Sequence, residues 1–364
     1  MRRKLTSDDV LAAVKGGSIY ACGGGGWADH GMMLGTAAVM AGQPELVSID
    51  ELDPDAWIAT AAAIGAPGES TAWQMLGVDY VRAVRLVEEW LGAPLAGLII
   101  GQNGMSSTLN AWLPSAILGL SVIDAVGDVR AHPTGDMGSI GLAGSPQPMI
   151  QAAAGGNRSM NAYIELLVKG ATARVSPVLR TAADMAGGFI ASCRNPVPAS
   201  YVKDHAALGG ISMAIELGNT ILAAEGQGGD SVRGAICEAT GGRILASGTV
   251  TAKNIAYARE AFDIGTITLA TASGDVTIHV MNEHMAVDAA NGDRIATYPD
   301  VITTLDRGGA PVSAGRIAEE MEIHILHVPY RLLPLSASVS DPAVYPPVEE
   351  ALKLSIAAYG PIGR

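Results

Sequence analysis

The chain has few cysteines and almost no phenylalanine. Its three cysteines, Cys22, Cys193 and Cys237, lie far apart and form no Cys-x-x-Cys pair. This pattern offers neither a disulfide framework nor a structural zinc site, and it is typical of a reducing compartment. Phe occurs only 2 times in 364 residues whereas Gly occurs 45 times. Small residues must therefore do much of the packing, and close contact between helices and sheets is expected.

Positive charge and long apolar runs are also scarce. The net charge is −13, which argues against a nucleic-acid partner because neutralising phosphates needs a basic surface. No segment reaches the roughly 18 apolar residues of a membrane span, and no apolar segment follows the basic residues 1–4 as in a secretory signal. We therefore expect a cytoplasmic protein without a membrane partner, and a homo-oligomer.

The common nucleotide and nucleophile motifs are missing. The sequence has no Gly-x-x-x-x-Gly-Lys-Ser/Thr loop and no Gly-x-Ser-x-Gly elbow. Four consecutive glycines occupy residues 23–26, but they do not form Gly-x-Gly-x-x-Gly and no clear strand precedes them. Asp50 lies at about the distance of the acidic residue in a dinucleotide fold, which leaves only weak support for a nucleotide. We expect no nucleotide cofactor.

Apolar runs alternate with amphipathic segments over the first part of the chain. This alternation predicts an α/β layered domain with a mostly parallel sheet over residues 1–160. A helix is expected to open at Thr6 or Ser7. The other expected helices are 31–41, 78–91 and 109–118, and the expected strands are 46–49, 57–64, 95–100 and 121–124.

The rest of the chain divides into two regions of different texture. Residues 161–228 are predicted to be a helical connecting region, with helices at 160–169, 175–186 and 198–224, the last broken at Gly209–Gly210. Residues 229–364 are predicted to form a β-rich second domain, because short apolar segments alternate there with Gly and Asp turns. Its expected strands include 232–236, 243–250, 264–270, 276–280 and 323–328.

Ligands of open α/β sheets bind beyond the carboxyl ends of the strands. The segments in such positions are 22–31, 65–69, 101–107 and 124–136. The last one holds three carboxylates, a guanidinium and an imidazole, namely Asp124, Asp128, Asp136, Arg130 and His132. A solvated polar loop is the plain alternative, but the position after an apolar strand favours a site.

The glycine run is the strongest candidate for ligand contact. A backbone without side chains can adopt φ > 0 and approach a ligand closely, so Gly24, Gly25 and Gly26 are predicted to bind substrate, together with Asp29. Cys22 directly precedes the run and is either a nucleophile or a small buried residue.

Other polar residues allow further roles. His30, His132 and Asp136 are candidate ligands of a divalent metal such as zinc, although acid–base and hydrogen-bonding roles are common for such histidines. Asn282 and Glu283 follow a predicted strand of the second domain. They either face the first domain across a cleft or belong to a polar hairpin turn.

Several of these pieces together resemble the DUF917 family, which is associated with S-methyl thiohydantoin desulfurase. The resemblance runs through most of the chain. It comprises the helix at 5–16, the glycine run, Ile64-Gly65-Ala66-Pro67, Asp124 with Arg130-Ala131-x-Pro133, Asn282-Glu283, Tyr298-Pro299-Asp300-Val301-Ile302 with Asp306, and Gly315. It implies a two-domain protein, α/β followed by β, that hydrolytically displaces methanethiol from a cyclic S-methylated isothiourea to give a hydantoin.

The sequence departs from this family in the predicted site loops. Residues 27–29 replace the family's Asp-Pro-Tyr, and residues 102–107 replace an expected Glu-Gly-Gly segment. Val126 stands where the family has a second Asp, and His132 occupies an aromatic position. The fold is therefore expected to carry over better than the substrate.

Taken together, these features predict a hydrolase acting on a small cyclic amide or an S-methyl thiohydantoin-type ring. The predicted catalytic residues are Cys22, Asp124, His132 and Glu283. Either Cys22 attacks covalently, or Asp124, His132 or a metal activates water. Arg130 is predicted to bind an anionic part of the substrate, and Asn282 to contact it. The alternatives are a non-catalytic ligand-binding or accessory protein of a hydantoinase-type system and, ranked last, a nucleotide-using transferase.

Overall fold

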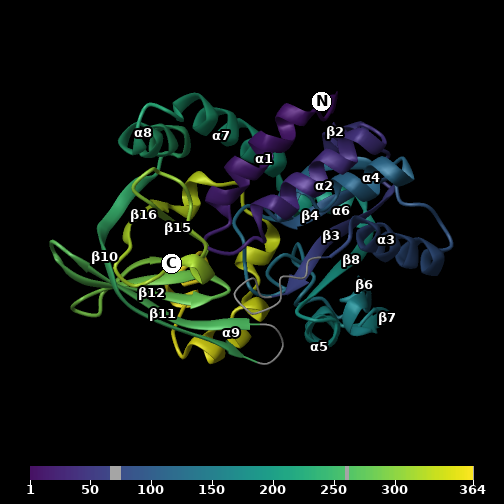
Figure 1. Cartoon of the computed structure of the whole chain (residues 1–364). Coiled ribbons are helices and arrows are strands. Elements are labelled where there is room, and N and C mark those ends of the chain that lie inside the picture. The colour runs from purple at the N-terminus through teal and green to yellow at the C-terminus, as the bar shows by residue number, and fades with distance from the viewer. Residues whose placement is uncertain (66–74, 259–261, 364) are drawn as a thin grey trace.

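The computed structural model describes residues 1–65, 75–258 and 262–363 (Figure 1). Two sheets, each with its own helices, lie side by side and meet near the middle of the molecule. The predicted fold class, an α/β domain followed by a β-rich domain, is confirmed. None of the helices in the described ranges has the length and apolar content needed to cross a membrane.

The first sheet has nine strands in the order β1-β2-β5-β4-β3-β8-β6-β7, with β9 added on β5. Strands β2, β5, β4 and β3 are parallel, and the other pairs are antiparallel. The sheet is therefore mixed and not mostly parallel as predicted, because β1, β8, β6, β7 and β9 join it in antiparallel pairs. The bounds are β1 Arg2–Lys4, β2 Glu45–Val47, β3 Trp57–Gly65, β4 Gly97–Gln102, β5 Ser121–Asp128, β6 Met149–Gly155, β7 Ile164–Gly170, β8 Phe189–Pro198 and β9 Ala207–Leu208.

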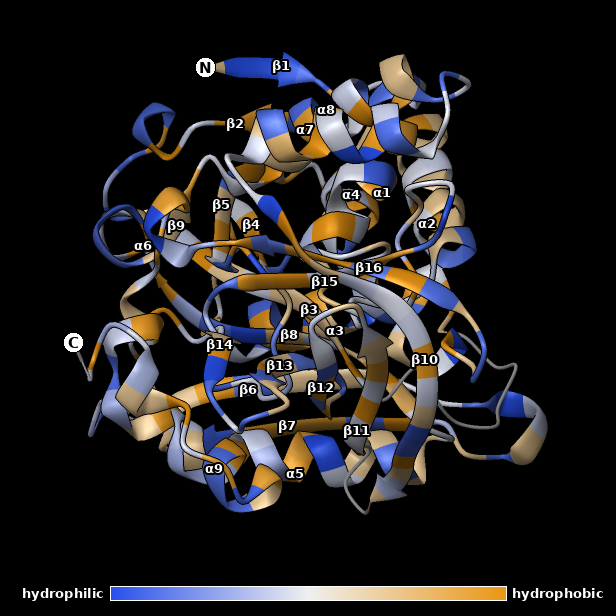
Figure 2. Cartoon of the chain, turned by 90° about the vertical axis from the view of Figure 1, so that its left-hand side faces the viewer, coloured by the Kyte–Doolittle hydropathy of each residue, from blue (hydrophilic) through white to orange (hydrophobic). Residues whose placement is uncertain are grey.

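Helices cover both faces of this sheet. One face packs against α1, α2, α3, α4 and α7 in the largest core cluster, and the other carries α5 and α6. The bounds are α1 Ser7–Tyr20, α2 Ala28–Ala41, α3 Gly77–Leu91, α4 Trp112–Leu118, α5 Thr172–Met185, α6 Ala199–His205 and α7 Gly210–Ala224. In Figure 2 the helices show bands of apolar and polar residues, as expected for elements with one buried face.

Local sequence explains where these helices begin and how closely they pack. At the start of α1, Thr6 Oγ1 accepts a hydrogen bond from the Asp9 amide while Asp9 accepts one from the Thr6 amide, which is a capping box. Small residues let α1 and α7 touch: a Cβ at Gly16 would lie 1.8 Å from the Ala214 carbonyl oxygen. The close packing expected from the glycine content thus occurs between helices.

The second sheet is antiparallel and has seven strands in the order β14-β13-β12-β11-β10-β16-β15. The long strand β10 curves around it (Figure 1). The bounds are β10 Arg243–Ala258, β11 Phe262–Thr271, β12 Gly274–Met281, β13 Glu283–Ala289, β14 Arg294–Thr297, β15 Val301–Leu305 and β16 Glu322–Val328, with helices α8 Gly229–Thr240 and α9 Pro346–Leu352.

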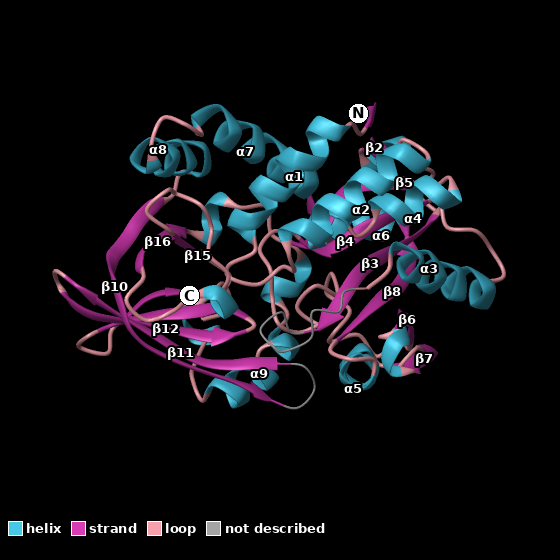
Figure 3. Cartoon of the chain, viewed as in Figure 1, coloured by secondary structure: helices cyan, strands magenta, loops and turns pink. Residues whose placement is uncertain are grey.

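Two predicted elements are wrong. Residues 164–170 form strand β7 rather than a helix, because they pair with β6 from Met149↔Gly170 to Gly155↔Ile164. Residues 232–236 belong to helix α8, in which Val232 and Ile236, four positions apart, both pack on the main core (Figure 3). Since β7 and β8 belong to the first sheet, residues 161–228 are not a purely helical connector. The break at Gly209–Gly210 separates α6 from α7, as predicted.

Candidate functional site

A pocket opens where the first sheet meets the second domain. It holds about 850 Å³ of empty space, counting its open mouth. The ends of β3 and β4 and the loops after α1, β4 and β5 contribute to it, and α5, β8 and the β12–β13 turn complete the wall. Its lining residues are 25–27, His30, 62–65, Met75, Gly101, Gln102, Ser106, Ser107, Asn110, 132–135, Ser176, Arg180, Phe189, Arg194, Asn282 and Glu283.

The glycine run brings the two domains together at this pocket. Gly25 and Gly26 line it, and both have positive φ, 72° and 82°. A Cβ at Gly24 would lie 2.1 Å from Glu283 Oε1, so this glycine makes room for a side chain of the second domain. Gly24 itself does not line the pocket; it packs behind Glu283.

Glu283 is a buried carboxyl group in the pocket wall. It follows Asn282, whose φ of 57° makes the tight turn between β12 and β13 and whose Oδ1 accepts a hydrogen bond from the Asp263 amide. Burial raises the pKa of Glu283 to about 7, against the opposing effect of Arg130 and Arg180. No described residue hydrogen-bonds to Glu283 Oε2. A carboxyl group with this pKa can both accept and donate a proton near neutrality.

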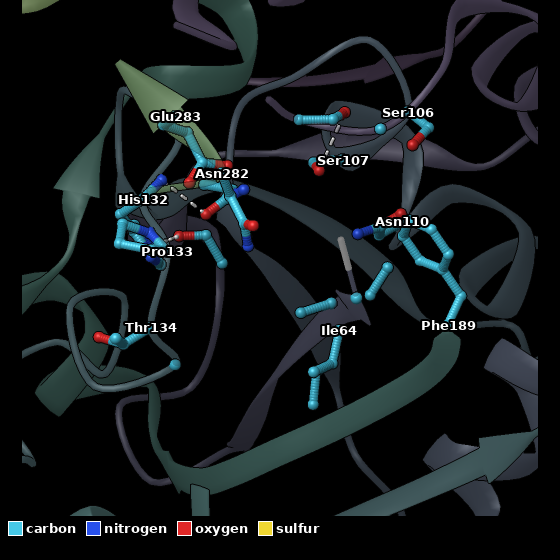
Figure 4. A pocket seen from close by; sticks show the side chains of 18 of the residues that line it. Ile64, Ser106, Ser107, Asn110, His132, Pro133, Thr134, Phe189, Asn282 and Glu283 are labelled. Carbon is cyan, nitrogen blue, oxygen red and sulfur yellow. Dashed lines mark hydrogen bonds between the residues drawn. The ribbon is translucent and has the colours of Figure 1, made fainter. Parts of the chain in front are cut away.

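His132 lies on the same side of the pocket as Asn282 and Glu283 (Figure 4). Its Nε2 is 3.3 Å from the Gly101 carbonyl oxygen, and its amide donates to Gln102 Oε1 at 3.1 Å. Because a carbonyl oxygen only accepts, this contact assigns the ring hydrogen to Nε2. Burial, with a smaller effect of Arg194, lowers the pKa of His132 to about 3, so the imidazole is neutral at physiological pH.

Two guanidinium groups also line the pocket. Arg180, on α5, donates to the carbonyl oxygens of Gly65 and Pro133 and stacks 4.2 Å from the centre of the Phe262 ring. Arg194, in the middle of β8, is 5% exposed and lies against Gly135 and Gly101. Burial lowers the pKa of Arg194, yet a guanidinium keeps its charge in proteins.

Besides Gly24, three further predicted site residues, Cys22, Asp124 and Asp29, lie outside the pocket wall. Cys22 is fully buried in the main core, and burial raises the pKa of its thiol, which opposes formation of a thiolate nucleophile. Asp124 lies within β5, not at its end, and its Oδ1 accepts hydrogen bonds from the Ile211 and Ser212 amides at the start of α7. It therefore caps a helix. Asp29 is exposed in the first turn of α2.

Arg130, which the sequence predicts to bind an anionic part of the substrate, does not line the pocket. The side chain is fully buried, with an exposed fraction of 0%. Its guanidinium donates to the carbonyl oxygens of Ala131, His284 and Asp300, and the bonds to His284 and Asp300 tie the first domain to the second. Its hydrogen-bonding groups thus hold the domains together instead of facing the pocket.

The candidate metal ligands are only partly gathered. His30 and His132 line the pocket, whereas Asp136 lies behind the wall and accepts a hydrogen bond from Ser176 Oγ at 2.9 Å. Among the described residues, no group of three or more His, Cys, Asp or Glu side chains is placed to hold a metal ion. The set His30, His132 and Asp136 does not fit the metal centre predicted from the sequence.

The pocket also contains residues that the sequence did not identify. Arg194 and Arg180 are the most important of them. Arg194 had a detectable signal, because it is the one charged residue among residues 189–198. Gln102, Ser106 and Ser107 belong to the loop predicted after β4, so the strand-end rule located them. Residues 66–69 of the loop predicted after β3 lie outside the described residues.

Comparison with known proteins agrees with this architecture. The model of the S-Me-THD-like N-terminal domain matches residues 8–162, and that of the S-Me-THD-like C-terminal domain matches residues 171–333. The fold is similar to an X-ray crystal structure of a protein from Chromobacterium violaceum, with a TM-score of 0.74, 21% identity and 96% of each chain covered. No curated protein matches the sequence. The two matched domains together span most of the chain, which therefore belongs to the S-Me-THD-like family, that of S-methyl thiohydantoin desulfurase.

Proposed function

We propose that the protein is a hydrolase that displaces methanethiol from an S-methyl thiohydantoin-type ring, or hydrolyses a related small cyclic amide. The observation that carries this proposal is Glu283. It is a buried carboxyl group with a pKa of about 7 in the wall of a pocket between the two domains. Membership of the S-Me-THD-like family supports the choice of ring.

The reaction requires one residue that takes and returns a proton. The ring carbon bonded to sulfur and two nitrogens is electrophilic, so a water oxygen can bond to it while the Glu283 carboxylate accepts a water proton. The C=N electron pair moves to nitrogen, which receives the second hydrogen of the water. When the C–S bond breaks, the proton on Glu283 passes to the sulfur, and the products are a hydantoin and methanethiol. One water is consumed and the ring stays closed.

The surroundings of Glu283 suit this role. His132 is neutral, so it adds no positive charge that would lower the raised pKa of Glu283. Since Cys22 lies outside the wall, water rather than a thiolate is the nucleophile in this mechanism.

The test measures methanethiol release from S-methyl 2-thiohydantoin with a thiol-specific dye. We expect wild-type turnover and a loss of about 100-fold or more in Glu283→Gln, the usual scale for a general acid–base group. Glu238→Gln is the matched control, because Glu238 is exposed on α8, away from the pocket. Full activity in Glu283→Gln would refute the mechanism, and lack of turnover by the wild type would refute this reaction.

A non-catalytic ligand-binding role is the second candidate. The observation that favours it is that departures from the family sequence, Trp27 and Gln102 among them, lie in the pocket wall. Thermal stabilisation of the protein by a hydantoin or thiohydantoin, without turnover of any of them, would support this candidate over the hydrolase.

A further inference from the structure

Arg194 is a buried cation to which the described part of the chain offers no hydrogen-bond acceptor. It lies in β8 between β3 and β6, opposite Thr60 and Gln151. None of the described residues accepts a hydrogen bond from its guanidinium, and its Nε is fully enclosed. A buried charge without a partner is costly, so such groups are normally paired or bind a ligand.

The end of the Arg194 side chain lies beside two glycines of the pocket wall. A Cβ at Gly135 would lie 2.1 Å from Arg194 Nη1, and one at Gly101 would lie 3.5 Å from Nη2. Both glycines line the pocket together with Arg194. The guanidinium therefore sits between Gly101 of β4 and Gly135 of the loop after β5, whose lack of side chains leaves its end nitrogens accessible from the pocket.

Neither of the neighbouring acids, Asp136 and Glu283, forms an ion pair with Arg194 among the described residues. Asp136 acts on Arg194 through space but forms no ion pair with it in the described structure, and burial raises the pKa of Asp136. Glu283, with a pKa of about 7, is only partly ionised near neutral pH. Arg180 adds a second positive charge and His132 adds none. The pocket is thus locally cationic in a chain with a net charge of −13.

We propose that this pocket binds its ligand as an anion, and that Arg194 is the residue that binds the negatively charged group. The identity of the ring in this inference rests on the proposed function, whereas the preference for a negatively charged ligand does not. Two sources supply an anion of the right kind. One is a carboxylate substituent on the ring, and the other is the ring imide itself after loss of its N–H proton. A guanidinium can bind either with two parallel hydrogen bonds.

The test compares matched ligands by isothermal titration calorimetry at pH 7. Hydantoin-5-acetic acid and its methyl ester differ by one negative charge and report on the substituent. We expect the acid to bind about tenfold or more tightly than the ester, the scale of one hydrogen bond to a charged group. Arg194→Gln should remove this preference. Arg174→Gln, an exposed arginine of α5 outside the wall, should retain it.

The ring imide gives a different result. If the imide is the anion, the acid and the ester bind with equal affinity at pH 7, and the affinity of both rises with pH. Methylation of the imide nitrogen, or the substitution Arg194→Gln, then abolishes this rise in affinity. Succinate and succinamide, which have no ring, test the charge preference separately. Two results together would overturn the proposal. The wild-type protein would bind the acid no more tightly than the ester and succinate no more tightly than succinamide, and its affinity for the hydantoins would not rise with pH. Anion preference without turnover would refute the hydrolase alone.

Discussion

Replacing Glu283 by glutamine should stabilise the fold above neutral pH while it removes the proposed activity. Glu283 has a pKa of about 7 in the folded protein against 4.5 for the free side chain. Between these values the folded state binds more protons than the unfolded state, so stability falls as the pH rises, and the cost is complete above pH 7. At about 1.4 kcal/mol per pKa unit this cost is roughly 3 kcal/mol.

Glutamine does not ionise, so the variant escapes this cost. Its amide nitrogen takes the place of Oε2, which has no hydrogen-bond partner in the described structure, and leaving that N–H unpaired costs about 1–2 kcal/mol. The net gain over wild type at pH 8 is therefore about 1–2 kcal/mol. At pH 5, where wild-type Glu283 is mostly protonated in the folded state, the gain should vanish.

Urea unfolding at pH 5 and pH 8 measures this difference. The wild type, Glu283→Gln and the exposed control Glu238→Gln should be compared at both values. The control should follow the wild type at each pH. If the stability of Glu283→Gln relative to wild type is the same at pH 5 and pH 8, Glu283 does not carry a raised pKa, and the proton-transfer role loses its physical basis.

Three further substitutions or titrations test the placement of other residues. The imidazole NMR signals of His132 should stay constant between pH 8 and pH 5, because its pKa is about 3; a midpoint near 6.5 would contradict its burial. Asp124→Ala should lower the free energy of unfolding by about 1–3 kcal/mol through loss of the α7 cap, with unchanged kcat in the folded protein. Cys22→Ala should keep full turnover, and an inactive but folded Cys22→Ala would restore the covalent mechanism.

Much of the first domain follows from local pattern. The apolar run at 57–64 predicts a buried strand, and it forms β3. Residues 78–91 repeat apolar side chains at helical spacing, and they form α3. The two wrong predictions, at residues 164–170 and 232–236, have different physical causes. Strand β7 is stabilised by pairing with β6, which the local sequence of β7 does not reveal. Val232 and Ile236 have helical spacing, but the glycine and aspartate residues near them favour turns.

The site was harder to predict because burial and partners depend on tertiary packing. The rule that ligands bind beyond strand ends located His132 and the loop after β4. The same rule misplaced Asp124, because β5 continues to Asp128 and the carboxylate turns to α7 instead. Composition alone also could not show which arginine faces the pocket. Arg130 donates its hydrogen bonds to backbone carbonyls, whereas Arg194 lines the pocket.

The glycine run has a different structural role from the ligand contact that its composition predicts. Only Gly25 and Gly26 line the pocket, whereas a Cβ at Gly23 would lie 2.6 Å from the His284 ring and one at Gly24 would meet Glu283. The run therefore leaves space for two adjacent side chains of the second domain. A phosphate loop exposes its amides to a ligand at a helix N-terminus, but here the missing side chains admit Glu283 into the wall. The glycines thus determine which carboxyl group reaches the pocket.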